Sequence, residues 1–253
     1  ALEATGGDPE KAVQHLREQG KKTYETKAGS RETSFGRVAV YLKPEANQAA
    51  MVEMLCESAP VVSNEGFMQL VNDAAQQLAA GPGAASPAAL MGQPSPSQPG
   101  HTLQDQLDAL YNQIREVFRL NRIVRIDAPC AGYIHHNAAV GVLLEVGGTA
   151  DMALAKDICM HIAAMSPKVV SPDQMDQAAV ETERNVLREA ARAEGKPEKI
   201  LDKMVEGRLR DFYAQHCLSE QPFVKDPSKT VGKVASEAGM KLVRFVHWQL
   251  GKE

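Results

Sequence analysis

Residues 36–56 read GRVAVYLKPEANQAAMVEMLC and contain two strand-like runs separated by a turn. The first run covers residues 36–42 and the second covers residues 49–56, and both are dominated by apolar side chains that suit a half-buried sheet. The segment from Lys43 to Asn47 includes a proline and an asparagine, which favour reversal of the chain. We therefore expect the two runs to pair as an antiparallel hairpin.

The order of a hairpin followed by a helix is predicted twice along the chain. Apolar residues recur at helical spacing in three later segments, residues 64–78, 103–117 and 152–165. Strand patterns cover residues 122–127, 133–136 and 140–146, with a turn at Asn137-Ala138. The fold is therefore expected to be α+β, with two core subdomains that each combine an antiparallel sheet with helices.

Two segments have a different composition. Residues 81–100 are rich in proline, glycine, alanine and serine, which predicts a flexible loop without chemistry. Residues 1–20 predict a small helical unit, in which Gly6-Gly7 ends one helix and Asp8-Pro9 starts the next. Residues 21–34 are expected to be a polar connector. Because the chain starts at Ala1 within a helical pattern, we expect further sequence before it.

Residues 171–216 predict a pair of helices that pack on each other. Ser171, Pro172 and Gln174 have the spacing of a helix start, and Gly195-Lys196-Pro197 interrupts the pattern. Each helix has one narrow apolar stripe, which the other helix alone can bury, so we expect a protruding antiparallel hairpin. The chain is then predicted to return through a short helix opened by Asp226-Pro227 and a last strand over residues 241–250.

The composition excludes several classes of function. With 43% hydrophobic and 24% charged residues the chain is expected to fold, and its net charge of −4 argues against direct binding to nucleic acid. The four cysteines are scattered without a CxxC pair, which fits a reducing compartment and no zinc site. No apolar run approaches the roughly 20 residues that span a bilayer, so we expect a cytoplasmic protein that does not bind membranes.

No residue pattern predicts a catalytic or metal site. His135 and His136 are expected to lie in a strand, where neighbouring side chains point to opposite faces and cannot easily share an ion. Ser228-Lys229-Thr230 lacks the upstream glycines of a phosphate-binding loop. A hydrolase using cysteine and histidine remains a formal alternative. We expect a protein-binding role with no cofactor, no metal ion and no catalytic residue.

Three segments carry a resemblance to a known family. Residues 155–164, AKDICMHIAA, resemble the KDIAMHIAA signature of bacterial elongation factor Ts. Residues 195–208 and residues 221–232, QPFVKDPSKTVG, are similar to two further segments of that family. Together with residues 1–20 and 51–67, the resemblance covers nearly the whole chain outside residues 81–100.

The resemblance implies both an architecture and a partner. It implies a partial UBA-like helical domain at residues 1–20, core subdomains at 35–128 and at 129–170 with 217–253, and a coiled-coil hairpin at 171–216. Members of the family bind the GTPase elongation factor Tu in its GDP-bound and nucleotide-free states and promote release of GDP without covalent catalysis. A homodimer or a 2:2 complex with elongation factor Tu is also compatible with the resemblance.

The resemblance also implies the residues that bind the partner. In the family, a loop with the pattern Thr-Asp-Phe-Val pushes an aromatic side chain into the GTPase and disturbs its magnesium and phosphate contacts. This chain has Ser58-Ala59-Pro60-Val61 there, without the acidic and aromatic members. Ile114-Arg115 stand where the family often has Ile-Gly, and His135 falls on a position that commonly contacts the partner.

Two hypotheses follow from the altered loop. In the first, the protein exchanges nucleotide on elongation factor Tu, with Pro60 and Val61 as a smaller, rigid wedge. In the second, it is a non-catalytic module that binds elongation factor Tu with weak exchange, because Ala59-Pro60 replace the Asp-Phe wedge. Exchange by differential binding requires no catalytic side chain, so both hypotheses are compatible with the absence of a catalytic pattern.

Overall fold

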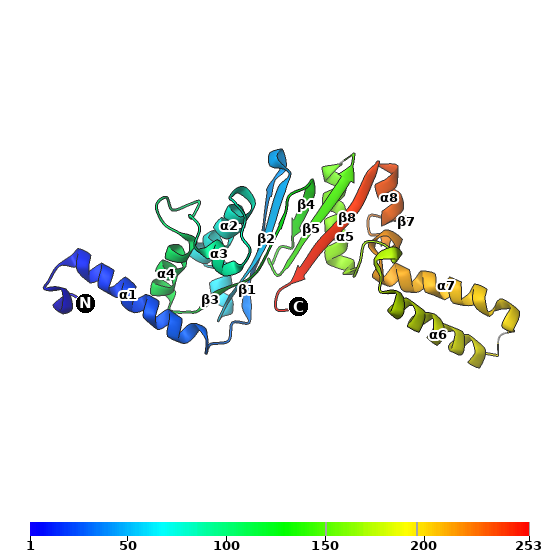
Figure 1. Ribbon diagram of the computed structural model, residues 1–253, viewed down its shortest axis with the longest axis horizontal. Helices are drawn as coiled ribbons and strands as arrows, with labels where there is room; N and C mark the ends of the chain where they lie inside the picture. The colour runs from blue at the N-terminus through cyan, green and yellow to red at the C-terminus, as the bar shows by residue number, and fades with distance from the viewer. Residues whose placement is uncertain (150, 196, 253) are drawn as a thin grey trace. The chain divides into compact units, whose positions relative to one another are not determined.

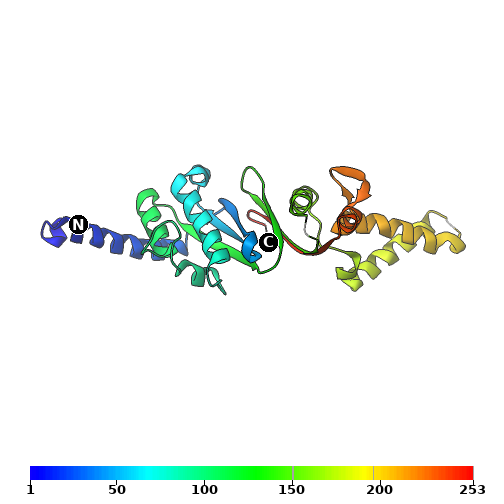
Figure 2. The same ribbon diagram turned by 90° about the horizontal axis from the view of Figure 1, so that it is seen from above.

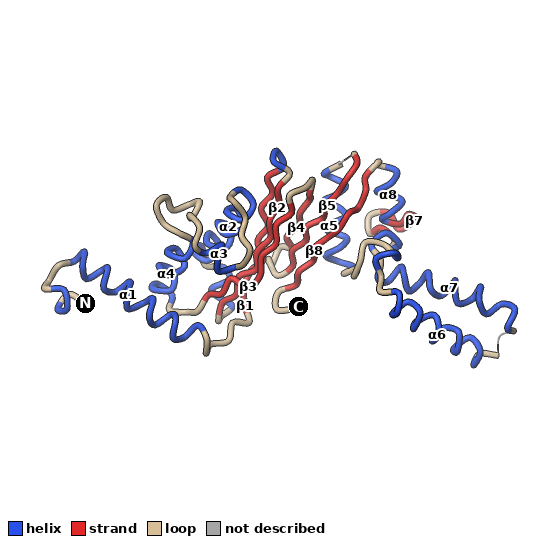
Figure 3. The backbone as a smooth tube through the Cα atoms, in the orientation of Figure 1, coloured by secondary structure: helices blue, strands red, loops and turns tan. Residues whose placement is uncertain are grey.

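The computed structural model describes residues 1–149, 151–195 and 197–252 and has mixed helices and antiparallel strands (Figures 1 and 3). The chain divides into two compact units. The first comprises Ala1–Leu143 and Trp248–Glu253, and the second comprises Leu144–His247. No helix among the described residues is both long and apolar enough to cross a membrane.

The predicted first hairpin is confirmed and forms most of the sheet of the first unit. Strands β1 (Phe35–Lys43), β2 (Gln48–Cys56) and β3 (Phe118–Ile126) are antiparallel in the order β1-β2-β3. The β1–β2 register runs from Phe35 opposite Cys56 to Lys43 opposite Gln48. Between them lies a 3₁₀ turn, η2 (Pro44–Ala46), closed by Asn47 at a φ of 50°. Strand β3 begins four residues before the predicted start at Arg122.

One face of this sheet is covered by helix α2 (Glu65–Ala80), as the apolar spacing predicts. Asn64 caps the helix by accepting a hydrogen bond from the Phe67 amide at 3.1 Å. Phe67, Leu70 and Val71 are fully buried in the resulting core. Helix α4 (Leu103–Ile114), which begins with a Thr102–Asp105 capping box, packs against α2.

The prediction of a flexible loop at residues 81–100 is wrong. The segment contains helix α3 (Pro87–Met91), whose Leu90 is fully buried. The carboxylate of Asp73 on α2 accepts hydrogen bonds from Ser97 and, at 2.9 Å, from Gln106, which itself accepts one from Ser95. A segment rich in small residues is therefore attached to the core by a few side chains, among them Leu90, Ser95 and Ser97.

The N-terminal helix is longer than predicted. After the short 3₁₀ turn η1 (Glu3–Thr5), α1 runs unbroken over Pro9–Ala28, so the first part of the predicted polar connector is helical. Tyr24 explains the extension, because its hydroxyl donates to the Phe118 carbonyl and its ring packs edge-on against Tyr111 at 5.3 Å. Burial raises the pKa of the Tyr24 phenol to about 12. Gly20 permits the approach, since a Cβ there would meet the Asn112 side chain at 2.0 Å.

The second hairpin begins in the first unit, where two of its glycines lie against the other face of the first sheet. It consists of β4 (Cys130–Ile134) and β5 (Val140–Gly148), which with β8 (Met240–Gln249) form a sheet of order β4-β5-β8. Gly132 lies against Val40, and Gly141 lies against Val38 and Met51, so closely that an added Cβ would meet their side chains within 2.8 Å. These two glycines therefore permit close packing of the hairpin on the sheet.

The second unit contains two antiparallel helices, α6 (Gln177–Ala193) and α7 (Glu198–His216), which lie side by side (Figure 2). Val180 on α6 packs against Val205 and Leu209 on α7. The ion pairs Arg184–Glu206 and Arg188–Asp202 show the antiparallel direction, because residue number rises on one helix as it falls on the other. Lys196, part of the predicted break, lies outside the described residues.

Two predicted helix starts in this unit are wrong. Ser171 precedes only a 3₁₀ turn, η4 (Pro172–Gln174), and α6 starts later, capped by Asp176. Asp226-Pro227 open no helix but begin β7 (Asp226–Thr230), which pairs with β6 (Pro222–Phe223). Helix α8 (Val231–Glu237) is capped by Thr230 instead. The predicted helix α5 (Met152–Met165) and the last strand β8 are confirmed.

Candidate functional site

The loop that follows β2 exposes two of the residues predicted to bind a partner. Ser58 is extended, and η3 (Ala59–Ser63) turns the chain toward α2. Ala59 and Pro60 are exposed at the surface. Val61, in contrast, is only 6% exposed and packs in the core with the residues under α2. The tip of the loop is therefore Ala59-Pro60, and Val61 serves as its apolar anchor.

Two carboxylates hold this loop in place. Glu57 accepts two hydrogen bonds of 3.0 Å from the Arg31 guanidinium and one of 2.7 Å from the Val117 amide. Glu116 accepts from the amide of Ser58 at 3.1 Å and from its hydroxyl at 2.6 Å. Charge-assisted bonds of this kind are stronger than neutral ones. The loop therefore presents its tip from a fixed backbone.

The same contacts bring Ile114-Arg115 next to the loop. Arg115 ends α4 in the left-handed conformation, at a φ of 66°, and its amide donates to the Tyr111 carbonyl at 2.7 Å. Glycine adopts this conformation without steric cost, so the Ile-Gly pattern of the resembling family fits the geometry. The Arg115 carbonyl accepts from Arg31 at 3.4 Å, and its side chain is exposed. Ile114 is half-buried against the core.

His135 lies in the turn between β4 and β5, and the prediction that it belongs to a strand is wrong. Its ring lies 4.3 Å from that of His136, so the argument from opposite strand faces does not apply. The turn joins β1 at Val38, whose amide donates to Ala138 at 2.8 Å, while the loop joins β1 at Arg37, which donates to the Val62 carbonyl at 3.1 Å. Within the described part of the chain, no hydrogen bond joins His135 to the loop.

The described residues contain neither a metal-binding cluster nor a surface cysteine. Within residues 1–149, 151–195 and 197–252, no cluster of three or more potential metal ligands is found. All four cysteines are buried, and burial raises the pKa values of Cys56 and Cys217 to about 11. A thiol of that pKa remains protonated near neutral pH and is a poor nucleophile.

His161, within the signature segment, is a buried structural histidine. Its Nε2 lies 2.9 Å from Gln221 Oε1, and its Nδ1 accepts from the Val224 amide at 3.3 Å. Burial lowers its pKa below the ordinary 6.5, which favours the neutral ring. The ring thereby attaches α5 to the segment that contains β6 and β7.

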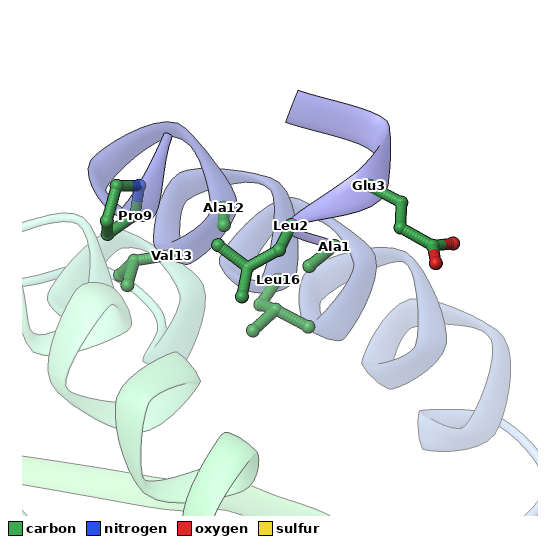
Figure 4. Close-up of a pocket in the computed structure, with 7 residues that line it drawn as sticks. All are labelled: Ala1, Leu2, Glu3, Pro9, Ala12, Val13 and Leu16. Atoms are coloured by element: carbon green, nitrogen blue, oxygen red, sulfur yellow. The ribbon is translucent and has the colours of Figure 1, made fainter. Parts of the chain in front are cut away.

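A second exposed surface lies at the N-terminus. Residues of η1 and of the first turns of α1 line an open apolar hollow, into which the side chains of Leu2, Val13 and Leu16 project (Figure 4). These three side chains are 50–55% exposed. Apart from Glu3, the residues that line the hollow carry apolar side chains.

Sequence reasoning found the loop but missed what holds it. Arg31 fell in the predicted connector, and Glu57 and Glu116 resemble ordinary solvated charges in the sequence. Only their contacts with Val117 and Ser58 reveal their role. A carboxylate adjacent to an irregular loop was the one available signal, and it is a weak one.

Two comparisons with known proteins identify the family of the chain. The family model described as "Elongation factor TS" matches residues 60–252. A relative from Thioalkalivibrio sulfidiphilus (strain HL-EbGR7), named "Elongation factor Ts", is 38% identical over 255 aligned residues. That alignment covers 100% of this chain and 85% of the relative.

Proposed function

The chain belongs to the elongation factor Ts family of translation elongation factors, and from that premise we propose how it acts on elongation factor Tu. It binds the GDP-bound GTPase through the Ser58–Val61 loop, disturbs the magnesium and phosphate contacts and releases GDP. GTP then binds to the freed site. The reaction needs no covalent step.

The observation that carries this proposal is the fixed, exposed tip of the loop. Ala59 and Pro60 stand at the surface while Glu57 and Ser58 behind them are held by Arg31 and Glu116. A rigid loop keeps its shape against a partner, so less ordering entropy opposes binding. If it fits the nucleotide-free GTPase better than the GDP form, linkage requires that GDP bind more weakly in the complex by the same ratio.

Other groups complete the proposed contact. Ile114 and Arg115 lie beside the loop, where Arg115 supplies an exposed positive charge, and His135 contributes from the turn between β4 and β5. The apolar side chains of η1 and α1 supply a second contact, through the UBA-like helical domain that we assign to residues 1–20. We assign residues 35–128, and residues 129–170 with 217–253, to two core subdomains and residues 171–216 to a coiled-coil hairpin. We place the protein in the cytoplasm, as a homodimer or in a 2:2 complex with elongation factor Tu.

The non-catalytic alternative is not favoured. Both comparisons name the chain's relatives as elongation factor Ts, and the loop that differs from the family pattern is nevertheless held by four hydrogen-bonded side chains (Arg31, Glu57, Ser58 and Glu116). A loop that had lost its role would need no such support. The alternative predicts a large gain in the rate of GDP release when the Asp-Phe wedge is restored.

The experiment replaces two prolines that lie at opposite ends of β2, Pro60 in η3 and Pro44 in η2. Pro60 and Pro44 are both exposed and both lie in the first positions of a short 3₁₀ turn. Pro60→Asp places an uncompensated charge at the proposed contact and is expected to reduce the acceleration of GDP release at least about tenfold. Pro44→Asp is the matched control and should leave the acceleration unchanged. Equal effects of both variants would contradict the assignment of the loop.

A second variant separates the two hypotheses. Ala59→Asp with Pro60→Phe restores the family pattern at the tip. If the present loop already promotes exchange, this variant changes the rate of GDP release by less than about threefold, which corresponds to under 1 kcal/mol. A rise of more than tenfold would instead support the non-catalytic binding module.

A further inference from the structure

Phe35, the first residue of β1, is a large aromatic side chain that the fold leaves 42% exposed. By contrast, Phe67, Phe118 and Phe223 are at most 4% exposed. A single exposed apolar side chain is common on protein surfaces and does not by itself indicate a binding site. Phe35 suggests one because it lies beside the candidate loop.

The strand register fixes where the Phe35 side chain lies. Phe35 is directly opposite Cys56 in the antiparallel pair, so the two side chains share one face of the sheet. Cys56 is the last residue of β2 and belongs to the core under α2, on the side from which the Ser58–Val61 loop leaves. Phe35 therefore lies at the end of the sheet, on the loop side.

Ion and hydrogen-bond contacts on both sides of Phe35 join its strand to this loop. Four residues before it, Arg31 pairs with Glu57, and two residues after it, Arg37 donates to the Val62 carbonyl at 3.1 Å. The residues that frame the loop tip are thus tied to the residues that frame Phe35. The loop itself, residues 57–63, contains no aromatic side chain.

We propose that Phe35 and Pro60 form one apolar surface that docks on elongation factor Tu, with Phe35 as its aromatic anchor. This inference rests on the proposed function, because the occupant is the GTPase that the loop engages. An aromatic centre surrounded by charged groups such as the Arg31–Glu57 pair is the usual anatomy of an interface hot spot. The site on the partner must be an apolar pocket large enough for a phenyl ring.

The test measures binding of Phe35→Ala to nucleotide-free elongation factor Tu and its acceleration of release of a fluorescent GDP analogue. Loss of an aromatic anchor is expected to weaken binding by about 10- to 30-fold and to slow release correspondingly. Val224→Ala is the control, because Val224 is 44% exposed and lies outside the proposed surface. Circular dichroism and urea unfolding establish that both variants fold like the parent chain.

The outcomes separate this inference from the proposed function. If the parent chain does not accelerate GDP release, the proposed function fails. If the parent chain does and Phe35→Ala matches it in both binding and release, the role of Phe35 is refuted. Phe35→Trp, which keeps an aromatic ring, should retain most of the affinity, whereas a merely structural role would give equal losses for Trp and Ala.

A double variant tests whether the two residues form one surface. If Phe35 and Pro60 dock together, Phe35→Ala with Pro60→Ala should weaken binding by less than the product of the two single losses, because the first truncation already disrupts the contact. A loss equal to that product would show independent contacts and overturn the single-surface proposal.

Discussion

The buried ion pair of the first sheet makes the most quantitative prediction. Glu53 on β2 has a side chain only 1% exposed and accepts hydrogen bonds from Arg122 at 2.8 Å and from Asn121 at 2.7 Å. Arg122 also donates to the Gln249 carbonyl at 3.0 Å, and its guanidinium lies 4.6 Å from the Trp248 ring centroid. Arg122→Ala would remove the three contacts made by Arg122 and would leave Asn121 as the hydrogen-bond donor to Glu53.

The magnitude follows from the burial of the carboxylate. Breaking a buried pair on one side costs about 3–5 kcal/mol, since the remaining charge is uncompensated. The Arg122 side chain is 23% exposed, so water can enter after truncation and the lower end of that range applies. Loss of the contact with Trp248 adds about 0.5 kcal/mol. We expect Arg122→Ala to reduce the free energy of unfolding, measured by urea titration, by about 3.5 kcal/mol.

Two controls isolate the charge effect. Arg122→Ala combined with Glu53→Gln removes the uncompensated charge and should be less destabilised than Arg122→Ala alone, by about 1 kcal/mol or more. Asp127→Ala breaks the ion pair with Arg125 of β3, but Asp127 is 61% exposed, so the cost should stay under about 1 kcal/mol. A cost below about 1 kcal/mol for Arg122→Ala, or no relief from Glu53→Gln, would refute this reasoning.

Three further predictions concern other buried groups. Asp73→Ala removes the acceptor for Ser97 and Gln106 and should cost about 3 kcal/mol while making residues 81–100 sensitive to limited proteolysis; unchanged proteolysis would contradict the role given to Asp73. Burial lowers the pKa of His161 below 6.5, so the unfolded chain protonates this histidine at a higher pH than the folded chain does. The contribution of the neutral ring to the free energy of unfolding is therefore present above pH 6.5 and decreases as the pH falls below that value. His161→Gln should flatten that pH dependence by up to about 1.4 kcal/mol per pH unit, and an unchanged slope would assign it to other groups. Cys56 and Cys217, with pKa values of about 11, should resist alkylation at pH 8 in the native protein and react in urea, as mass spectrometry can show; rapid native labelling would contradict their burial.

Local periodicity was sufficient to predict most elements. Helices α2 and α5 are predictable because their buried apolar residues recur at helical spacing, and the strands around Pro44 are predictable because two apolar runs flank turn residues. The wrong predictions concern segments whose structure depends on a contact with a residue far away in the sequence. Helix α1 continues to Ala28 because Tyr24 reaches the Phe118 carbonyl, and residues 81–100 are structured because Asp73 binds Ser97.

The wrong helix start at Ser171 has a different cause. Ser171 and Asp176 are both good capping residues followed by helix formers, and the sequence signal cannot rank them. Only Asp176 is followed by residues whose apolar face packs on α7.

The family resemblance predicts the loop of the candidate site. The burial of Val61 and the roles of Glu57 and Glu116 could not be predicted, because they depend on contacts between the segment after β2 and the segment after α4.

The central claim is that the protein accelerates nucleotide release from elongation factor Tu. The most direct measurement is release of a fluorescent GDP analogue from the cognate elongation factor Tu, followed by stopped flow with increasing concentrations of this protein and excess unlabelled GDP. Our account predicts a release rate that rises with the concentration of the protein and then saturates, as expected for release from a ternary complex. A rate independent of its concentration, alongside measurable binding of the two proteins, would contradict the account.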